Sequence, residues 1–323
     1  LILLTFRNIH NVKLSFANAY RYLDNKEMDC MRYVLENDTL RVEIDSFGAE
    51  LKSVKRKSDD KEYMWYADKK YWGRTSPVLF PFVGNCKNKE YRYGGKTYAI
   101  GQHGFARDME HTMESRTEDT IWFSLHSNEE TMEKYPFAFV LKIGYNLTGN
   151  ELKVMWKVEN PDTKTLYFSI GAHPAFLCPF NGEENKLGYG LQFAGLKEVH
   201  HHGNTPDTGL AVMSEDIVIP LEDEKVYFTP GFFDRCTYMV EGKQTGEVSL
   251  VTPDGKPYVT MDFDAPLFAI WSPEGKDAPF VCIEPWYGRC DADDFDGTLE
   301  ERAYENAVEP EQTFEASYSI RYL

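Results

Sequence analysis

The sequence has no apolar run long enough to cross a membrane as a helix, and it is poor in positive charge. A membrane-spanning helix needs about 18 consecutive apolar residues, and no stretch approaches that length. The 35 Lys and Arg residues face 52 Asp and Glu residues, which gives a formal net charge of −17. Nucleic acid and anionic membranes repel such an acidic chain, so neither is an expected partner.

Cysteine is also scarce, and its spacing argues against the common cysteine-based sites. None of the 6 cysteines forms a C-x-x-C pair, and no signal peptide is evident. We therefore expect reduced thiols, a cytoplasmic protein and no metal site. The triplet His200–His202 lacks zinc-ligand spacing. Consecutive residues of a strand would also point to opposite faces, so we predict a solvent loop there.

The N-terminal region differs from the rest of the chain. Its apolar start, residues 1–6, is too short for a secretory core, and no basic residue precedes it. Met28 and Met31 lie just before the first clear strand pattern. We interpret residues 1–30 as an extension outside the fold, with an arm packed on the domain as the alternative. Residues 31–323 are expected to form one domain.

Helical periodicity is rare, and the apolar–polar alternation typical of strands dominates from residue 40 onward. Residues 137–147 alternate, a turn follows around Gly149, and residues 152–158 alternate again. This pattern predicts a long hairpin with one buried face. Further turns and a C-terminal strand are predicted at Gly94-Gly95, Asp254-Gly255 and residues 314–322. Many strands without a linker or repeat predict an all-β fold, a large antiparallel sandwich or barrel.

Two residues suited to proton transfer follow apolar, strand-like runs. His173 comes shortly after the run 166–170, and Glu284 ends the run 280–283 and precedes Pro285. An imidazole titrates near neutral pH, and burial raises the pKa of a carboxyl toward the same range. One acid and one base, each at the end of a core strand, indicate proton transfer on a small molecule.

Four segments, in this order along the chain, resemble the aldose 1-epimerase (galactose mutarotase) superfamily and its LacX-like subgroup. They are Trp72–Pro81, Gly101–Asp108, Gly171–Phe176 and Phe280–Trp286. Four ordered motifs are more specific than any one of them. The resemblance implies a galactose-mutarotase-like β-sandwich, a supersandwich, whose members interconvert the α and β anomers of a sugar without a cofactor.

The resemblance also implies roles for individual residues. Glu284 matches the base that removes the proton of the C1 hydroxyl, and His173 matches the acid that protonates the ring oxygen. His103 and Arg74 match substrate-binding residues.

Two more positions are assigned to substrate binding. Arg107 is expected to bind the sugar or a phosphate, with an ion pair to Asp108 as the alternative. Asp234 matches the sugar-binding aspartate of the family, with Cys236 as the alternative at that position.

Three functions follow from these features. The first is a cofactor-independent aldose 1-epimerase acting on a hexose. The second is a hexose-6-phosphate 1-epimerase, with Arg74, Arg107 and Lys87 as phosphate ligands. The third is a non-catalytic carbohydrate-binding protein of the same fold. The presence of both proton-transfer residues favours an enzyme, and the absence of a dense cluster of Lys and Arg favours a free sugar.

Overall fold

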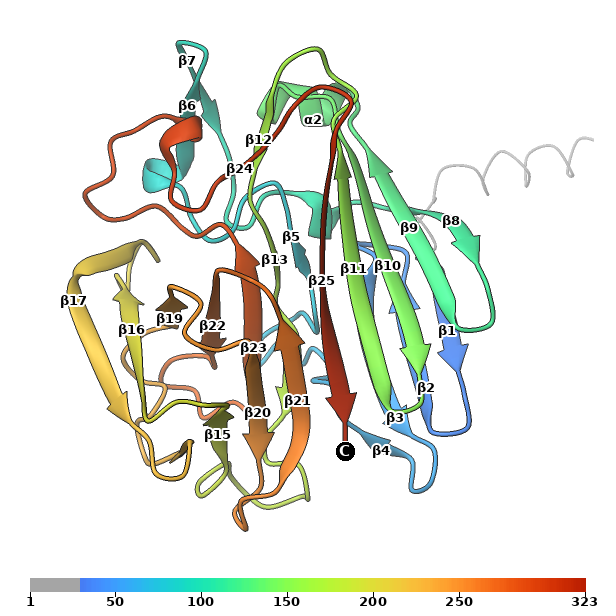
Figure 1. The fold of residues 1–323 in the computed structure, drawn as a ribbon, viewed down its shortest axis with the longest axis vertical. Coiled ribbons are helices and arrows are strands. Elements are labelled where there is room, and N and C mark those ends of the chain that lie inside the picture. The colour runs from blue at the N-terminus through green and yellow to red at the C-terminus, as the bar shows by residue number, and fades with distance from the viewer. Residues whose placement is uncertain (1–29) are drawn as a thin grey trace, which may run out of the picture. The chain divides into compact units, whose positions relative to one another are not determined.

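The computed structural model describes residues 30–323, and these residues form an almost entirely β fold (Figure 1). Residues Arg32–Leu323 make up one compact unit. The predicted N-terminal extension lies outside the described residues. Within residues 30–323, no helix is both long enough and apolar enough to cross a membrane.

Three antiparallel sheets account for most of the fold (Figure 1). The four-stranded sheet consists, in spatial order, of β1 (Arg32–Glu36), β2 (Leu40–Asp45), β3 (Glu50–Arg56) and β4 (Lys61–Glu62). The nine-stranded sheet consists of β18 (Lys225–Tyr227), β15 (Gly190–Phe193), β20 (Glu247–Val251), β21 (Pro257–Phe263), β25 (Thr313–Tyr322), β11 (Glu151–Glu159), β10 (Val140–Thr148), β9 (Thr120–His126) and β8 (Thr112–Arg116). The eight-stranded sheet consists of β17 (Ala211–Pro220), β16 (Glu198–Asn204), β19 (Tyr238–Glu241), β22 (Leu267–Trp271), β23 (Phe280–Tyr287), β13 (Ile170–Ala172) and β5 (Val78–Leu79), with β14 (Ala175–Leu177) also paired to β23.

Short elements complete the unit. Two ribbons pair β6 (Glu90–Tyr93) with β7 (Lys96–Ala99) and β12 (Leu166–Phe168) with β24 (Asn306–Val308). The helical elements are α2 (Glu129–Lys134) and the 3₁₀ turns η1 (Lys87–Lys89), η2 (Ala106–Asp108) and η3 (Leu299–Glu301).

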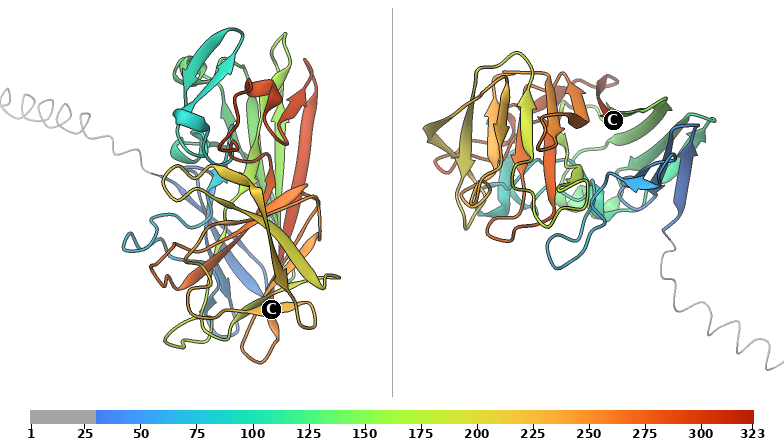
Figure 2. Two further views of the ribbon diagram at one scale, coloured as in Figure 1. Left: turned by 90° about the vertical axis from the view of Figure 1, so that its left-hand side faces the viewer. Right: turned by 90° about the horizontal axis from the view of Figure 1, so that it is seen from below.

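The three sheets share one core. A single cluster of buried side chains contains Val42 of the four-stranded sheet, Val154 of the nine-stranded sheet and Ile283 of the eight-stranded sheet. Strands β10, β11 and β25 run side by side in all views (Figures 1 and 2). The expected all-β antiparallel sandwich is confirmed, because alternation gives each strand one apolar face to bury against the others.

The predicted hairpins are confirmed. Strands β10 and β11 pair from Val140–Glu159 to Thr148–Glu151. Gly149 has φ +57° in the turn between them, a backbone conformation that glycine adopts without a steric penalty. The ribbon β6–β7 and the pair β20–β21 form at the other two turn signals.

Strand β23 corrects one expectation, because Glu284 lies inside this strand and not at its end. The strand continues through Pro285 to Tyr287. On one side it pairs with β13 up to Gly171–Trp286, and pairing resumes in β14 at Ala175–Cys282. The ladder is therefore interrupted opposite Glu284 and Pro285. A proline, which has no N–H, is tolerated at such an interruption.

The solvent loop predicted at His200–His202 is wrong. These residues belong to β16, in which His201 is buried. The His200 Nδ1 atom lies 2.8 Å from Oδ2 of Asp216 on the neighbouring β17. Successive histidines point to opposite faces of the strand, so the three rings do not converge.

Candidate active site

The four motif segments, together with residues from other loops and strands, line a cavity of about 430 Å³. On β23, Val281 and Ile283 face the common core, so the alternate residues Cys282, Glu284 and Trp286 face the other side of the sheet. The cavity lies on that other side. Its lining residues are Trp72, Gly84, Asn85, Gln102, His103, Arg107, His173, Asn204, Pro206, Asp207, Thr208, Gly209, Thr237, Met239, Trp271, Glu274, Glu284, Trp286 and Cys290.

His173 follows β13 directly, where the ladder with β23 is interrupted. The Trp72 ring stacks on the imidazole, with centroids 4.6 Å apart and an interplanar angle of 26°. The Trp271 ring meets it edge-on at 5.3 Å and 87°. Enclosure between two indoles fixes the ring and removes water. Burial, with the Arg107 charge as a smaller cause, lowers the pKa of His173 to about 3.

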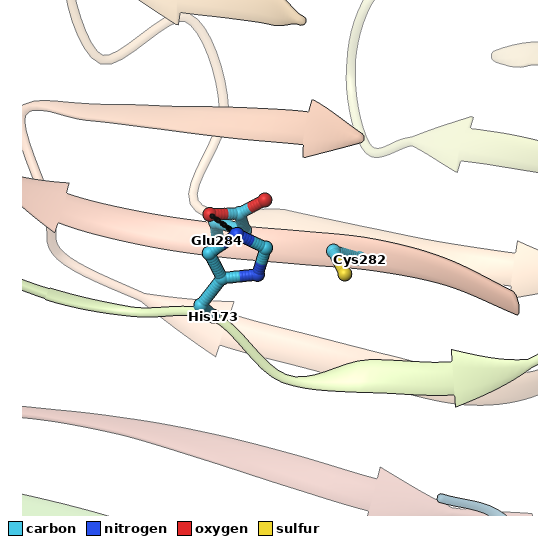
Figure 3. Close-up of side chains that lie close together, drawn as sticks. All are labelled: His173, Cys282 and Glu284. Atoms are coloured by element: carbon cyan, nitrogen blue, oxygen red, sulfur yellow. Dashed lines mark ion pairs between the residues drawn. The ribbon is translucent and has the colours of Figure 1, made fainter. Parts of the chain in front are cut away.

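Glu284 projects from β23 toward this imidazole (Figure 3). Its Oε2 atom lies 3.4 Å from Nε2 of His173, and its side chain is 1% exposed. Oε2 has no hydrogen-bond partner, and neither has Nδ1 of His173. Burial raises the pKa of Glu284 well above its usual value, and a hydrogen bond from Trp286 opposes this only in part.

The two shifts have a common origin and a joint consequence. Burial disfavours the carboxylate of Glu284 and the imidazolium of His173 alike. Burial therefore favours the placement in which Glu284 is protonated and His173 is neutral over the placement in which both are charged. The two placements differ by one transfer over the 3.4 Å between Oε2 and Nε2. Such a pair donates a proton with one member and accepts with the other.

His103 supplies a neutral hydrogen-bond donor to the same cavity. Its Nδ1 accepts a hydrogen bond of 3.0 Å from the backbone N–H of Gly84. The neutral ring therefore carries its hydrogen on Nε2. Burial, followed by the Arg107 charge, lowers the pKa of His103 well below its usual value. The ring lies edge-on to His173, with centroids 5.7 Å apart.

Gly104 sets the conformation of the loop that carries His103. It has φ +66°, and a Cβ at this position would lie 2.3 Å from the backbone oxygen of Phe80. Only glycine allows the two backbones to approach so closely.

The two predicted arginines lie next to each other at different depths. Arg107 lines the cavity, and its Nη2 donates to the carbonyl of Gln102 at 2.7 Å. Its Nε atom is buried without a hydrogen-bond partner, and burial lowers its pKa to about 10. Arg74 is absent from the cavity lining and pairs with Asp108 at 2.7 Å. The Asp108 carboxylate also lies 3.8 Å from the Arg107 guanidinium, so it partly neutralises both cations.

The structure does not bring Asp234 to this cavity. Asp234 lines a separate cavity of about 310 Å³, and its Oδ1 accepts a hydrogen bond from the backbone of Gly275. From the same segment, Thr237, which directly precedes β19, lines the cavity that holds His173 and Glu284. Lys87 also lies elsewhere, where its Nζ donates to the carbonyl of Phe295.

Several lining residues carried no motif that sequence reasoning could use. Asn204 ends β16, Asp207 and Thr208 follow in the next loop, and Glu274 lies after β22. The sequence around these residues shows only a turn-like composition. Such a composition predicts a loop, but it does not predict which cavity the side chains of that loop line.

Three side chains at the base of the site offer metal-ligating atoms close to one another. Ligand atoms of His173, Cys282 and Glu284 all lie within 4.8 Å of one another, and all three residues are buried. His173 and Glu284 line the cavity, whereas Cys282 lies beneath its surface.

Comparison with known proteins shows the family to which the chain belongs. The family model for aldose 1-epimerase matches residues 31–291. The chain is 31% identical over 300 residues to the chromosomal protein LacX of Lactococcus lactis subsp. lactis, covering 91% of this chain and 100% of the relative.

Two solved structures are also similar. A galactose mutarotase related enzyme from Lactobacillus acidophilus shares 37% identity with a TM-score of 0.85, covering 91% of this chain and 97% of that one. A galactose mutarotase-like protein from Lactobacillus casei shares 29% identity with a TM-score of 0.83, covering 91% and 100%.

Proposed function

Since the chain belongs to the aldose 1-epimerase family, we propose that it is a cofactor-independent epimerase that interconverts the α and β anomers of a free hexose. The observation that carries the proposal is the buried pair of His173 and Glu284, 3.4 Å apart. The C1 hydroxyl oxygen and the ring oxygen of a sugar are bonded to the same carbon. An acid and a base that act on these two oxygens must therefore lie close together, as this pair does.

Proton transfer in the proposed reaction is balanced within the site. The Glu284 carboxylate takes the proton of the C1 hydroxyl, the bond between C1 and the ring oxygen breaks, and protonated His173 gives its proton to that oxygen. The aldehyde group then rotates about the C1–C2 bond. The reverse transfers close the ring on the other face of the carbonyl and restore both residues.

Burial makes the pair suited to repeated turnover. Ring opening leaves Glu284 protonated and His173 neutral, which is the placement that burial favours. Substrate hydroxyls and neighbouring donors stabilise the opposite, charged placement. Both states thus stay accessible, which general acid–base catalysis requires.

Neighbouring groups are proposed to hold the sugar. His103 Nε2–H and the Arg107 guanidinium, which lines the cavity, would donate to sugar oxygens. The carboxylates of Asp207 and Glu274, which line the same cavity, would accept from sugar hydroxyls. Since these carboxylates oppose the Arg107 charge, the lining favours a neutral sugar over a phosphorylated one.

Purified protein is expected to accelerate the mutarotation of at least one aldose without added metal or nucleotide. The test is a polarimetric screen over hexoses and hexose 6-phosphates, with sugar binding measured in parallel by calorimetry. Binding without acceleration of any bound sugar would favour the non-catalytic alternative. Activity lost on addition of a chelator would contradict the metal-free mechanism.

The variant Arg107→Ala tests whether the substrate is a free hexose or a hexose 6-phosphate. We expect comparable losses of kcat/KM on glucose and on glucose 6-phosphate, within about threefold of each other, because Arg107 is proposed to contact the sugar ring. A charge-assisted phosphate contact is stronger than a neutral one, so a loss confined to glucose 6-phosphate would support the phosphosugar alternative. Arg41→Ala, on β2 of the four-stranded sheet, serves as the matched control.

A cytoplasmic location remains a prediction. All 6 cysteines are free in the structure.

A further inference from the structure

Cys282 has no place in the proposed reaction, yet it lies beside the two residues that carry it. Cys282 and Glu284 are two positions apart on β23, so both side chains project from the same face (Figure 3). His173 reaches toward them from the segment between β13 and β14 (Figure 3). The ligand atoms of the three side chains lie within 4.8 Å of one another.

From this arrangement we propose that His173, Cys282 and Glu284 form a binding site for a thiophilic divalent cation such as Zn²⁺, and that the bound ion blocks the site. Imidazole nitrogen, thiolate sulfur and carboxylate oxygen are all established Zn²⁺ ligands. Three protein ligands leave a fourth tetrahedral position, which faces the cavity and is filled by water or a sugar hydroxyl.

The geometry suits a tetrahedral ion. Zn–N and Zn–O bonds of about 2.0–2.1 Å place two tetrahedral ligands about 3.4 Å apart. The observed separation of His173 Nε2 and Glu284 Oε2 is 3.4 Å. The longer Zn–S bond of about 2.3 Å requires a sulfur within roughly 3.6 Å of the other ligands. Since the three ligand atoms lie within 4.8 Å of one another, the proposal requires the Cys282 thiol to approach the other two ligands by at most about 1 Å when the ion binds.

An unsatisfied polar atom and charge balance favour the same occupant. Oε2 of Glu284, the oxygen proposed to bind the ion, is buried without a hydrogen-bond partner, and Glu284 is 1% exposed. Such an atom is costly to leave unpaired. On binding, the thiol proton and the proton held by the His173–Glu284 pair pass to solvent. One thiolate, one carboxylate and a neutral imidazole then cancel the charge of a divalent ion, and a neutral complex is the form that a buried site tolerates.

The ion reaches the site through the cavity, because His173 and Glu284 line it and Cys282 lies behind them. It would occupy the proton-accepting atom of Glu284 and a nitrogen of His173. Metal binding itself does not depend on the proposed function, whereas the resulting inhibition does. Hard cations such as Mg²⁺ prefer oxygen ligands, so they should bind much more weakly.

The test titrates the full-length protein with Co²⁺ and with Zn²⁺. All variants carry Cys30→Ser, because the Cys30 thiol is exposed and would bind metal on its own. Co²⁺ should produce a sulfur-to-cobalt charge-transfer band that Zn²⁺ abolishes, and this readout needs no enzymatic activity. Zn²⁺ should inhibit mutarotation, measured relative to each variant's own rate, and Mg²⁺ should not.

Cys282→Ala should remove the charge-transfer band and weaken Zn²⁺ inhibition at least about tenfold. Cys282→Ser, which keeps the volume, should behave in the same way. Cys290→Ala is the matched control, because Cys290 is a buried thiol that lines the cavity outside the trio. It should keep the band and the Zn²⁺ affinity. A band that survives both Cys282 variants, a loss of equal size in Cys290→Ala, or inhibition by Mg²⁺ as strong as by Zn²⁺ would overturn the proposal.

Discussion

Glu284→Gln is expected to lower kcat by about 10²–10⁴-fold, the range typical for loss of a general base. The amide has nearly the same shape as the carboxyl group, so it fits the same buried position. It cannot accept the proton of the C1 hydroxyl. Since substrate contacts from His103 and Arg107 remain, the dissociation constant for the sugar should change much less than kcat. Polarimetry and calorimetry on the same preparation separate the two effects.

The control for this variant is Glu274→Gln, which removes a second carboxylate from the same cavity. Glu274 has no histidine partner in the structure, so its loss should act on KM more than on kcat. A near-normal kcat in Glu284→Gln would remove Glu284 from the mechanism. Equal losses of kcat in both variants would show that the rate depends on the negative charge in the cavity, and that Glu284 does not act as a specific base.

His173→Gln is expected to reduce kcat by a similar factor of about 10²–10⁴. Glutamine extends far enough to place an amide nitrogen near the position of Nε2. It still donates a hydrogen bond, but it cannot transfer a proton to the ring oxygen. Any residual rate would come from the Nε2–H of His103, whose ring lies edge-on to His173. The loss should appear in the initial rate of mutarotation at saturating sugar.

The matched control is His111→Gln, a substitution of a buried histidine that does not line the cavity. Burial lowers the pKa of His111 to about 4, as it also lowers that of His173. If a buried neutral histidine were needed only for stability, both variants would lower the melting temperature and leave kcat per folded molecule unchanged. We expect that outcome for His111→Gln alone.

Strand pattern and turn chemistry were enough to predict a large antiparallel sandwich or barrel, and the family resemblance implied the sandwich. The alternation in residues 137–158 specified both strands of the β10–β11 hairpin, because one buried face imposes a period of two. The same period explains why residues of β23 divide between the core and the cavity. The position of Glu284 inside β23 was missed, since Pro285 usually marks the end of a strand. Only the interruption between β13 and β14, a tertiary feature, makes proline acceptable there.

The candidate site was predicted as far as its motifs extend. His103, Arg107, His173 and Glu284 meet at one cavity, as expected from the resemblance. Asp207 and Glu274 were not foreseen, because they lie in loops whose direction depends on the packing of β16 and β22. Asp234 illustrates the same limit. The sequence match identifies a segment that reaches the cavity. Within that segment, however, Thr237 lines the cavity and Asp234 lines a separate one.

The most direct test of the central claim is anomeric exchange at equilibrium, measured by NMR magnetisation transfer between the α and β signals of a sugar that the protein binds. The wild type and Glu284→Gln are compared at the same fraction of bound sites, so that differences in affinity cancel. The His173–Glu284 mechanism predicts exchange well above the spontaneous rate in the wild type and a rate close to spontaneous in the variant. Equal acceleration by both proteins, or no acceleration by the wild type at full occupancy, would contradict it.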